Sequence, residues 1–308
     1  MTARSYFILT CVFQDMSKNI LAIGEVLFDV LPDGAKLGGA PANFAWYCHQ
    51  FGFNDFVISA VGDDADGEDI IKRLKALGIN TAAVDILHGE KTGIVNVTLN
   101  AASVPSYEIV KNVAWDKITC GEDKLALARK ADVICFGTLA QRGEVSHRSI
   151  NKILDNAPKH CLKIFDVNLR QSFYSFEILD SGLKKANILK ISDEELPKTA
   201  EVLGLEHSSD EAFCLTLLKK YDLYIIVLTR GEKGSIIFTK DNMYKSAGVK
   251  AEKLADTVGA GDSFSAAFCA GLLKGLDFDT IGQRANKVAS YVCTQKGAMA
   301  VLPKDLLF

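Results

Sequence analysis

The sequence predicts an α/β fold in which a mainly parallel sheet is covered by helices on both faces. Short apolar runs recur along the chain and alternate with segments whose apolar residues have helical spacing. Repeated strand–helix–strand units of this kind form parallel sheets. One stretch near residue 95 alternates between apolar and polar residues instead, which is typical of a half-exposed strand. The 308 residues are 48% hydrophobic, which is enough for one large core.

Several apolar runs are predicted to be buried strands of this sheet. The first is Ile20–Asp29, and the others cover residues 56–61, 132–137, 162–166, 187–191 and 224–229. Continuous apolar runs are typical of strands that are buried on both faces. Ligands collect at the carboxyl ends of parallel strands. We therefore expect Asp29, Asp166 and Thr229, which each close a predicted strand, to lie where the chemistry takes place.

Helices are predicted between these strands. Apolar residues fall at helical spacing in two segments, Ile70–Leu77, which ends at Gly78, and Leu125–Ala128. Each segment would cover one face of the sheet with its apolar side.

The alternating stretch at residues 91–100 predicts a hairpin that stands apart from the main sheet. Tyr107–Val110 can pair with it across a turn near residues 103–105. A hairpin above a ligand would exclude water from the reaction. A surface hairpin without a catalytic role is the alternative.

The segment Asp256–Phe264 is the most informative functional signal. Apolar residues recur every four positions after it, so a helix is predicted to begin there. The first turn of a helix presents unpaired N–H groups and the positive end of the dipole, and Gly259 and Gly261 let backbone approach an anion. A carboxylate repels a phosphate, so we expect Asp262 to accept the proton of an attacking hydroxyl. An ordinary capped helix start is the alternative.

A second motif lies near the other end of the chain, at residues 37–45. Pro41 suits the first turn of a helix, and two glycines before it leave room for a ligand against the backbone. Asn43 offers a donor and an acceptor together, and Asp29 accepts protons from hydroxyls. The pair is suited to binding vicinal hydroxyls, and a turn with an Asx cap is the alternative.

Other classes of protein are disfavoured. The dinucleotide fingerprint fails because Phe264 occupies the third glycine position, and no P-loop motif occurs. A net charge of −3 gives no reason to expect a nucleic acid or a membrane as partner. The eight cysteines include no C-x-x-C pair, and the five histidines show no metal spacing. Cys135, Cys161 and Cys269 lie in apolar runs and are interpreted as buried reduced thiols.

Residues 38–45 and 256–264, in this order, resemble the two signatures of the PfkB (ribokinase-like) carbohydrate kinase family. Phe165–Arg170 resembles the family's D-x-N-x-R strand end, and Val227–Ser235 its nucleotide-binding T-x-G-x-x-G turn. The resemblance covers residues 18–305. It implies a ribokinase-like three-layer α/β/α sandwich, with a mainly parallel sheet and a small β-strand lid over the sugar.

The resemblance implies a kinase domain at residues 16–308, with lid strands from about 30–37 and 90–112, and a homodimer formed through the lid. Met16 directly precedes the first strand and reads as a natural start. Residues 1–15 are therefore interpreted as an N-terminal extension that is disordered or not native, and a signal peptide is the alternative. A kinase that uses ATP is expected in the cytoplasm.

Within the family, the opening Gly24–Asp29 followed by Pro32-Asp33-Gly34 is similar to that of bacterial fructokinases. The form of residues 39–43 is fructokinase-like too. The resemblance implies phosphorylation of D-fructose to fructose 6-phosphate. The alternatives are a kinase for 2-keto-3-deoxygluconate or another small sugar, a nucleoside kinase, and a sugar-responsive regulator that kept the fold.

The resemblance also implies roles for individual residues. Asp262 would be the base, and the amides of Gly259, Ala260 and Gly261 would bind the transferred phosphoryl group. Sugar contacts would come from Asp29, Gly39, Asn43, Gln141 and Arg142, with Arg170 as a cation near the substrates. ATP would lie along Thr229, Gly231, Gly234 and Asn286.

Metal ions complete the expected site. Mg²⁺ would bridge the phosphates of ATP, with Glu195 ordering its waters. Here Ser192 stands where the family often has an asparagine. A monovalent cation such as K⁺ would bind at Asp256, the carbonyl of Val258 and the loop at Gly297.

Overall fold

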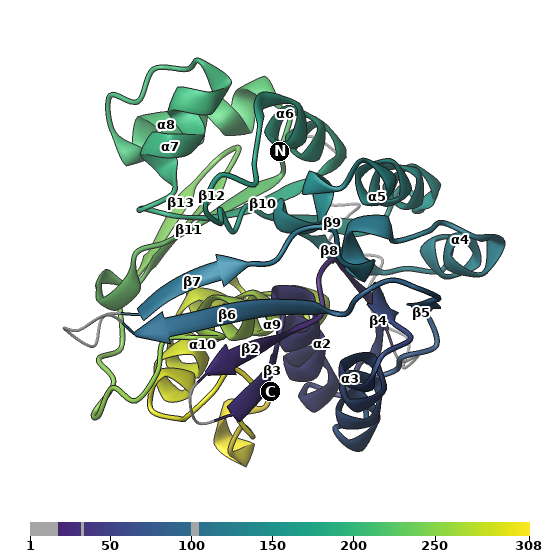
Figure 1. Cartoon of the computed structure of the whole chain (residues 1–308). Helices are drawn as coiled ribbons and strands as arrows, with labels where there is room; N and C mark the ends of the chain where they lie inside the picture. The colour runs from purple at the N-terminus through teal and green to yellow at the C-terminus, as the bar shows by residue number, and fades with distance from the viewer. Residues whose placement is uncertain (1–17, 32–33, 100–104) are drawn as a thin grey trace.

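The computed structural model describes residues 18–31, 34–99 and 105–308. Within these residues the main sheet has nine strands in the order β13-β12-β11-β10-β9-β8-β1-β4-β5 (Figure 1). In chain order they are β1 (Asn19–Ile23), β4 (Asn54–Gly62), β5 (Val84–Leu87), β8 (Val133–Phe136), β9 (Leu162–Asp166), β10 (Ile188–Ser192), β11 (Ile225–Thr229), β12 (Ser235–Thr239) and β13 (Met243–Ser246).

The main sheet is parallel from β5 to β11, and β12 and β13 join it antiparallel. Strand β1 lies in its interior, with β4 on one side and β8 on the other. The chain first extends the sheet through β4 and β5 and later through β8 and its successors. The gap between β1 and β8 is thus a topological switch point, where ligands bind in open α/β sheets.

Helices cover both faces of the main sheet. One face packs against α2 (Ala40–Gln50), α3 (Ala65–Ala76), α9 (Ala260–Leu273) and α10 (Phe278–Cys293), and the other carries α4 (Glu122–Ala128), α5 (Glu144–Asn156), α6 (Phe176–Lys185), α7 (Leu196–Leu203) and α8 (Asp210–Lys220). Alternate residues of each strand enter the two cores, as with Leu21 and Ala22. The predicted three-layer sandwich is confirmed.

A small sheet stands apart from the main one, with the order β3-β2-β6-β7 (Figure 1). Its strands are β2 (Leu27–Leu31), β3 (Gly34–Gly38), β6 (Gly93–Leu99) and β7 (Pro105–Ile109). The predicted hairpin is its β6–β7 pair, which is antiparallel. The predicted turn at residues 103 and 104, the Pro32-Asp33 pair and the extension at residues 1–15 lie outside the described residues.

The prediction of one strand over Ile20–Asp29 was wrong. The run is divided between the two sheets, because β1 ends at Ile23 and β2 begins at Leu27. Gly24 lies at the break with φ 149, and a Cβ there would lie 2.9 Å from Pro41 Cγ. A side chain would therefore clash at this bend. As a result, Asp29 lies within a strand of the small sheet rather than at the end of a strand in the main sheet.

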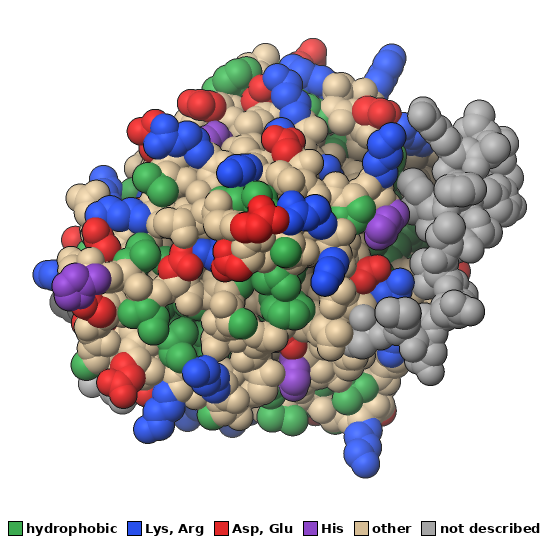
Figure 2. All heavy atoms as spheres, turned by 90° about the vertical axis from the view of Figure 1, so that its right-hand side faces the viewer, with side chains coloured by type: hydrophobic (Ala, Val, Ile, Leu, Met, Phe, Trp, Pro, Cys, Tyr) green, Lys and Arg blue, Asp and Glu red, His purple; other side chains and the backbone are tan. Residues whose placement is uncertain are grey.

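The surface mixes charges of both signs. In Figure 2, Lys and Arg side chains are interspersed with Asp and Glu side chains over the face shown, with apolar side chains between them. This mixing agrees with the small net charge of −3. Among the residues that the structure describes, no helix is long and apolar enough to cross a membrane.

Candidate active site

The N-termini of two packed helices, α2 and α9, form the centre of the site. Gly39 precedes α2 with φ 104, and a Cβ there would lie 2.4 Å from the Glu25 carbonyl oxygen. Gly259 precedes α9 with φ 81, and a Cβ there would lie 2.4 Å from the Ala298 carbonyl oxygen. Both positions require glycine. The two predicted helix starts are thus held against backbone from distant parts of the chain.

Asn43 and Asp262 meet where these helices begin. Asn43 Nδ2 donates a hydrogen bond to Asp262 Oδ2 at 2.7 Å, although the residues are 219 positions apart in sequence. Asn43 is only 3% exposed, and its Oδ1 is buried without a partner among the described residues. A buried acceptor without a donor is costly. A ligand hydroxyl at this position would satisfy it.

Burial changes the proton affinity of Asp262. Desolvation is the main cause that raises its pKa from 3.8 to about 6, and the charge of Asp166 raises it further. The bond from Asn43 and the charges of Lys190 and Arg170 act in the opposite direction. A carboxylate with a pKa near 6 is ionised at neutral pH, yet it accepts a proton more readily than an exposed one.

A small cavity of about 20 Å³ adjoins Asp262 at the switch point, with room for about one water molecule. Glu25, Phe136, Asp166 and Ser265 are among its lining residues. Burial raises the pKa of Glu25 to about 7. Sequence reasoning gave Glu25 no role, although it belongs to the opening Gly24–Asp29 that carried the resemblance.

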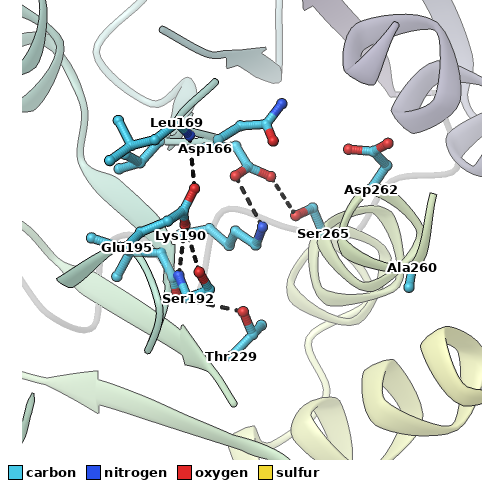
Figure 3. A network of polar contacts seen from close by, with 12 residues as sticks. Asp166, Leu169, Lys190, Ser192, Glu195, Thr229, Ala260, Asp262 and Ser265 are labelled. Carbon is cyan, nitrogen blue, oxygen red and sulfur yellow. Dashed lines mark hydrogen bonds and ion pairs between the residues drawn. The ribbon is translucent and has the colours of Figure 1, made fainter. Parts of the chain in front are cut away.

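A buried ion pair adjoins the same cavity (Figure 3). Lys190 Nζ on β10 lies 3.0 Å from Asp166 Oδ1 at the end of β9, and Ser265 on α9 donates to Asp166 Oδ2 at 3.1 Å. The prediction that Asp166 lies near the chemistry agrees with this position. Lys190 was missed, but a lysine inside the apolar run Ile188–Ile191 was a signal that could have found it.

Glu195 links the end of β10 to the segment after β9 by hydrogen bonds. It accepts hydrogen bonds from the Leu169 amide at 2.8 Å, the Ser192 amide at 2.8 Å and the Ser192 hydroxyl at 3.0 Å (Figure 3). No group of three or more His, Cys, Asp or Glu side chains among the described residues could hold a metal by itself. A single carboxylate fixed in this way fits the prediction that Glu195 orders waters around a Mg²⁺ ion, since Mg²⁺ usually keeps several of its waters.

The predicted monovalent-cation residues are brought together. Asp256 accepts hydrogen bonds from the Val258 amide at 3.0 Å and from the Gly297 amide at 3.2 Å. This carboxylate links the loop before α9 to the loop after α10. The carbonyl of Val258 remains available as an oxygen ligand of the kind that hard cations prefer.

The predicted nucleotide residues gather around the antiparallel end of the main sheet. Thr229 ends β11, Gly231 begins the short 3-10 helix η3 (Gly231–Lys233), and Gly234 follows it and leads into β12. A Cβ on Gly234 would lie 2.1 Å from the Ser246 carbonyl oxygen. Asn286 on α10 donates to that same oxygen at 3.4 Å and to the Ala247 carbonyl oxygen at 3.2 Å.

Asp29 and Arg170 face the same region from different elements. The pKa of Asp29 is raised by burial, and the positive charge of Arg170 acts against that shift. Arg170 is exposed, and its charge also lowers the pKa of Glu25 and of Asp262. One cation therefore acts on carboxyl groups from both ends of the chain.

Two predicted sugar contacts are bound to protein instead. Gln141 donates to the Gly137 carbonyl oxygen at 2.7 Å and pairs with His147 at 3.0 Å. Arg142 bonds Asp116 at 2.8 and 3.1 Å, and its guanidinium stacks on Trp115. Only Nη1 of Arg142 lacks a partner within the described part of the chain, and that atom is buried. The role of Gln141 and Arg142 as contacts to a sugar stays a prediction.

The predicted anion-binding amides lie at the start of α9. The Ala260 amide donates to the Thr257 carbonyl oxygen at 3.3 Å, and the first bond within α9 runs from the Ser263 amide to the Gly259 carbonyl oxygen. The amides of Gly261 and Asp262 therefore lie in the first turn, where no intrahelical acceptor exists. These two amides join that of Gly259 as candidates for binding an anion, and the predicted role of the Gly259, Ala260 and Gly261 amides stays a prediction.

Known proteins are similar to this chain in sequence and in fold. The model of the pfkB family carbohydrate kinases matches residues 25–305. An uncharacterized sugar kinase of Pyrococcus horikoshii is 30% identical over an alignment of 307 positions that covers 94% of each chain. Its crystal structure has a TM-score of 0.80 and covers 94% of this chain and 96% of that one, and another crystal structure of it contains ATP.

Named fructokinases are similar over nearly their whole length. Fructokinase-2 of Solanum lycopersicum is 30% identical over 92% of this chain and 93% of its own, and the Escherichia coli fructokinase is 28% identical over 94% and 97%. The chain therefore belongs to the pfkB family of carbohydrate kinases and is an ATP-dependent sugar kinase.

Proposed function

We propose that this sugar kinase phosphorylates D-fructose to fructose 6-phosphate. The observation that carries the proposal is the 2.7 Å contact between Asn43 and Asp262. It joins a group suited to sugar hydroxyls to a base at the N-terminus of α9. The choice of fructose is supported by relatives named as fructokinases and by the fructokinase-like opening at Gly24–Asp29.

The proposed reaction is an in-line phosphoryl transfer. Asp262 accepts the proton of the primary hydroxyl while that oxygen bonds to the γ-phosphorus, and the bond to the β-phosphate oxygen breaks to leave ADP. The amides of Gly261 and Asp262 stabilise negative charge on the transferred group. Asn43 and Asp29 orient the sugar, and Arg170 offsets charge on the phosphates.

Mg²⁺, when bound, would neutralise charge on the phosphates of ATP and align them. Glu195 would order its waters, and the Leu169 and Ser192 bonds fix that carboxylate. A K⁺ ion at Asp256, Val258 and Gly297 would order the loop before α9. Equal turnover in potassium and in a large organic cation would exclude that role.

The small sheet is proposed to cover the sugar and to form the contact of a homodimer. Val30 and Tyr107 on this sheet are 38% and 53% exposed, which leaves apolar surface for a partner. Light scattering that gives the mass of one chain at micromolar concentration would contradict the dimer. A cytoplasmic location is proposed because the enzyme uses ATP.

A substrate panel tests the proposed function. ADP production would be measured with fructose, ribose, mannose, 2-keto-3-deoxygluconate and adenosine at equal concentrations. We expect the highest kcat/KM with fructose. A kcat/KM for another compound ten or more times that for fructose would overturn the fructose assignment.

A further inference from the structure

The Asp166–Lys190 ion pair is buried beneath the first turn of α9. The two side chains are only 9% and 11% exposed. A buried ion pair of this kind often adds little stability compared with apolar residues of similar size. Its position beside Asp262 therefore calls for a role other than stability.

The ion pair contacts α9, the helix that carries the base Asp262. Ser265, which holds Asp166 Oδ2 at 3.1 Å, is three residues after Asp262 and so lies on the same side of the helix. A Cβ on Gly261 would lie 3.2 Å from Lys190 Nζ. In Figure 3, the ammonium group of Lys190 points toward Asp166 and α9, and Asp262 lies one turn away on that helix.

The surroundings of Asp262 contain more acids than cations. The titratable or charged groups that act on it, or that it acts on, come from every neighbouring element: Glu25 after β1, Tyr47 on α2, Cys135 on β8, Asp166 on β9, Arg170 after β9 and Lys190 on β10, with Glu195 beyond Lys190. Arg170 is exposed, whereas Lys190 is buried. Of the two cations named here, Lys190 is therefore the buried one.

We propose that the Asp166–Lys190 pair is a positioning element that sets how readily Asp262 accepts the proton of the sugar hydroxyl. Lys190 favours the ionised form of Asp262, and Asp166 opposes that effect. The directions of the pKa shift of Asp262 agree, because Asp166 raises that pKa and Lys190 lowers it. The inference rests on the proposed reaction, in which Asp262 is the base.

The test measures kcat/KM for ATP-dependent sugar phosphorylation against pH in Asp166→Asn and Lys190→Met. The acid limb of this profile is the fall in kcat/KM at low pH as Asp262 becomes protonated. Removing Asp166 removes a negative charge that raises the pKa of Asp262, so the acid limb should move to lower pH by about one unit. Removing Lys190 leaves the carboxyl groups of Asp166 and Asp262 without the cation between them, and the two then titrate as a pair. The pair should take up its first proton at higher pH, so the acid limb should move to higher pH by about one unit. The sugar KM should change by less than about threefold in both variants.

A purely structural role would not produce shifts in opposite directions. It would lower activity or stability in both variants and leave the acid limb in place. The matched controls are Lys198→Met and Glu201→Gln, which break an exposed ion pair of 2.8 Å on α7. Their acid limbs should coincide with that of the wild type.

Two gentler variants keep the test decisive if a single variant does not give the circular dichroism spectrum of the wild type. Ser265→Ala removes a bond to the charged form of Asp166, and the Asp166→Asn/Lys190→Met double variant buries no unpaired charge. Ser265→Ala should make Asp166 easier to protonate and so reduce the negative charge beside Asp262, which moves the acid limb to lower pH. The double variant should move it in the same direction, because the charge of Asp166 has a larger effect on the pKa of Asp262 than the charge of Lys190.

Shifts in the same direction for the two single variants would overturn the proposal, as would acid limbs that do not move. For Ser265→Ala and the double variant, acid limbs within about 0.1 pH unit of the wild-type limb would likewise overturn the proposal. A wild-type protein that phosphorylates no sugar would contradict the proposed function instead. The two failures are therefore distinguishable.

Discussion

Two regions of this kinase bury ionised groups, but they balance charge differently. At the base of the small sheet, Arg142 bonds Asp116 twice and stacks between the rings of Trp115 and Phe173. At the junction of α2 and α9, burial is the main cause that raises the pKa values of Asp262 and Glu25 to about 6 and 7, and neighbouring acids add to it. Paired charges hold the fold together, whereas burial beside further acids makes a carboxylate accept protons near neutral pH.

Replacing the base should have the largest effect. Asp262→Asn should lower kcat by about 10²- to 10⁴-fold with little change in sugar KM, because the amide cannot accept the hydroxyl proton. Steady-state kinetics measures this. Asp279→Asn, in the exposed first turn of α10, is the matched control and should retain wild-type rates. Normal turnover by Asp262→Asn would show that another group is the base.

Breaking the matched pair should affect stability instead of proton transfer. Asp116→Ala leaves the Arg142 guanidinium, whose side chain is 8% exposed, without its carboxylate. We expect the free energy of unfolding to fall by about 3–5 kcal/mol, measured by urea denaturation. The acid limb of the remaining activity should stay in place.

The control for that variant is an exposed pair. Asp69→Ala removes the partner of Arg73 on α3, where both side chains are more than 40% exposed, and should cost less than about 0.5 kcal/mol. An equal loss in the two variants would contradict the distinction between buried and exposed pairs.

A smaller effect should come from Asn43→Ala. The wild-type acid limb of kcat/KM is expected near pH 6, the pKa of Asp262. The Asn43 bond lowers that pKa, so its loss should move the limb to higher pH by up to about one unit. Activity below pH 6 should then fall more than activity at pH 8. Asn156→Ala, which removes an exposed bond to the Lys152 carbonyl oxygen, should leave the profile unchanged.

Local patterns were enough to predict much of the fold. The buried strands, the β6–β7 hairpin and the starts of α2 and α9 each depend on residues within a short window. Apolar periodicity, Pro41 and the glycines before each helix act within such windows. The two motifs could therefore be identified before any contact between them was known.

Other features depended on distant parts of the chain. A polar side chain can bind a ligand or another protein group, and only its neighbours in space decide which. Arg142 contacts Asp116 and Trp115, and Gln141 contacts His147, and the sequence predicted none of these protein partners. Glu25 and Lys190 became part of the site because strands β1 and β10 bring them beside α9.

The sequence by itself determined the α/β class, the two glycine-rich helix starts and the acid at position 262, because each is encoded by neighbouring residues. Only the tertiary structure decided that Ile20–Asp29 serves two sheets and that Asp262 is surrounded by Asn43, Asp166 and Lys190. Burial and charge around a group come from segments that are distant in sequence, as with Asn43, which is 219 positions from Asp262, and these contacts set its proton affinity.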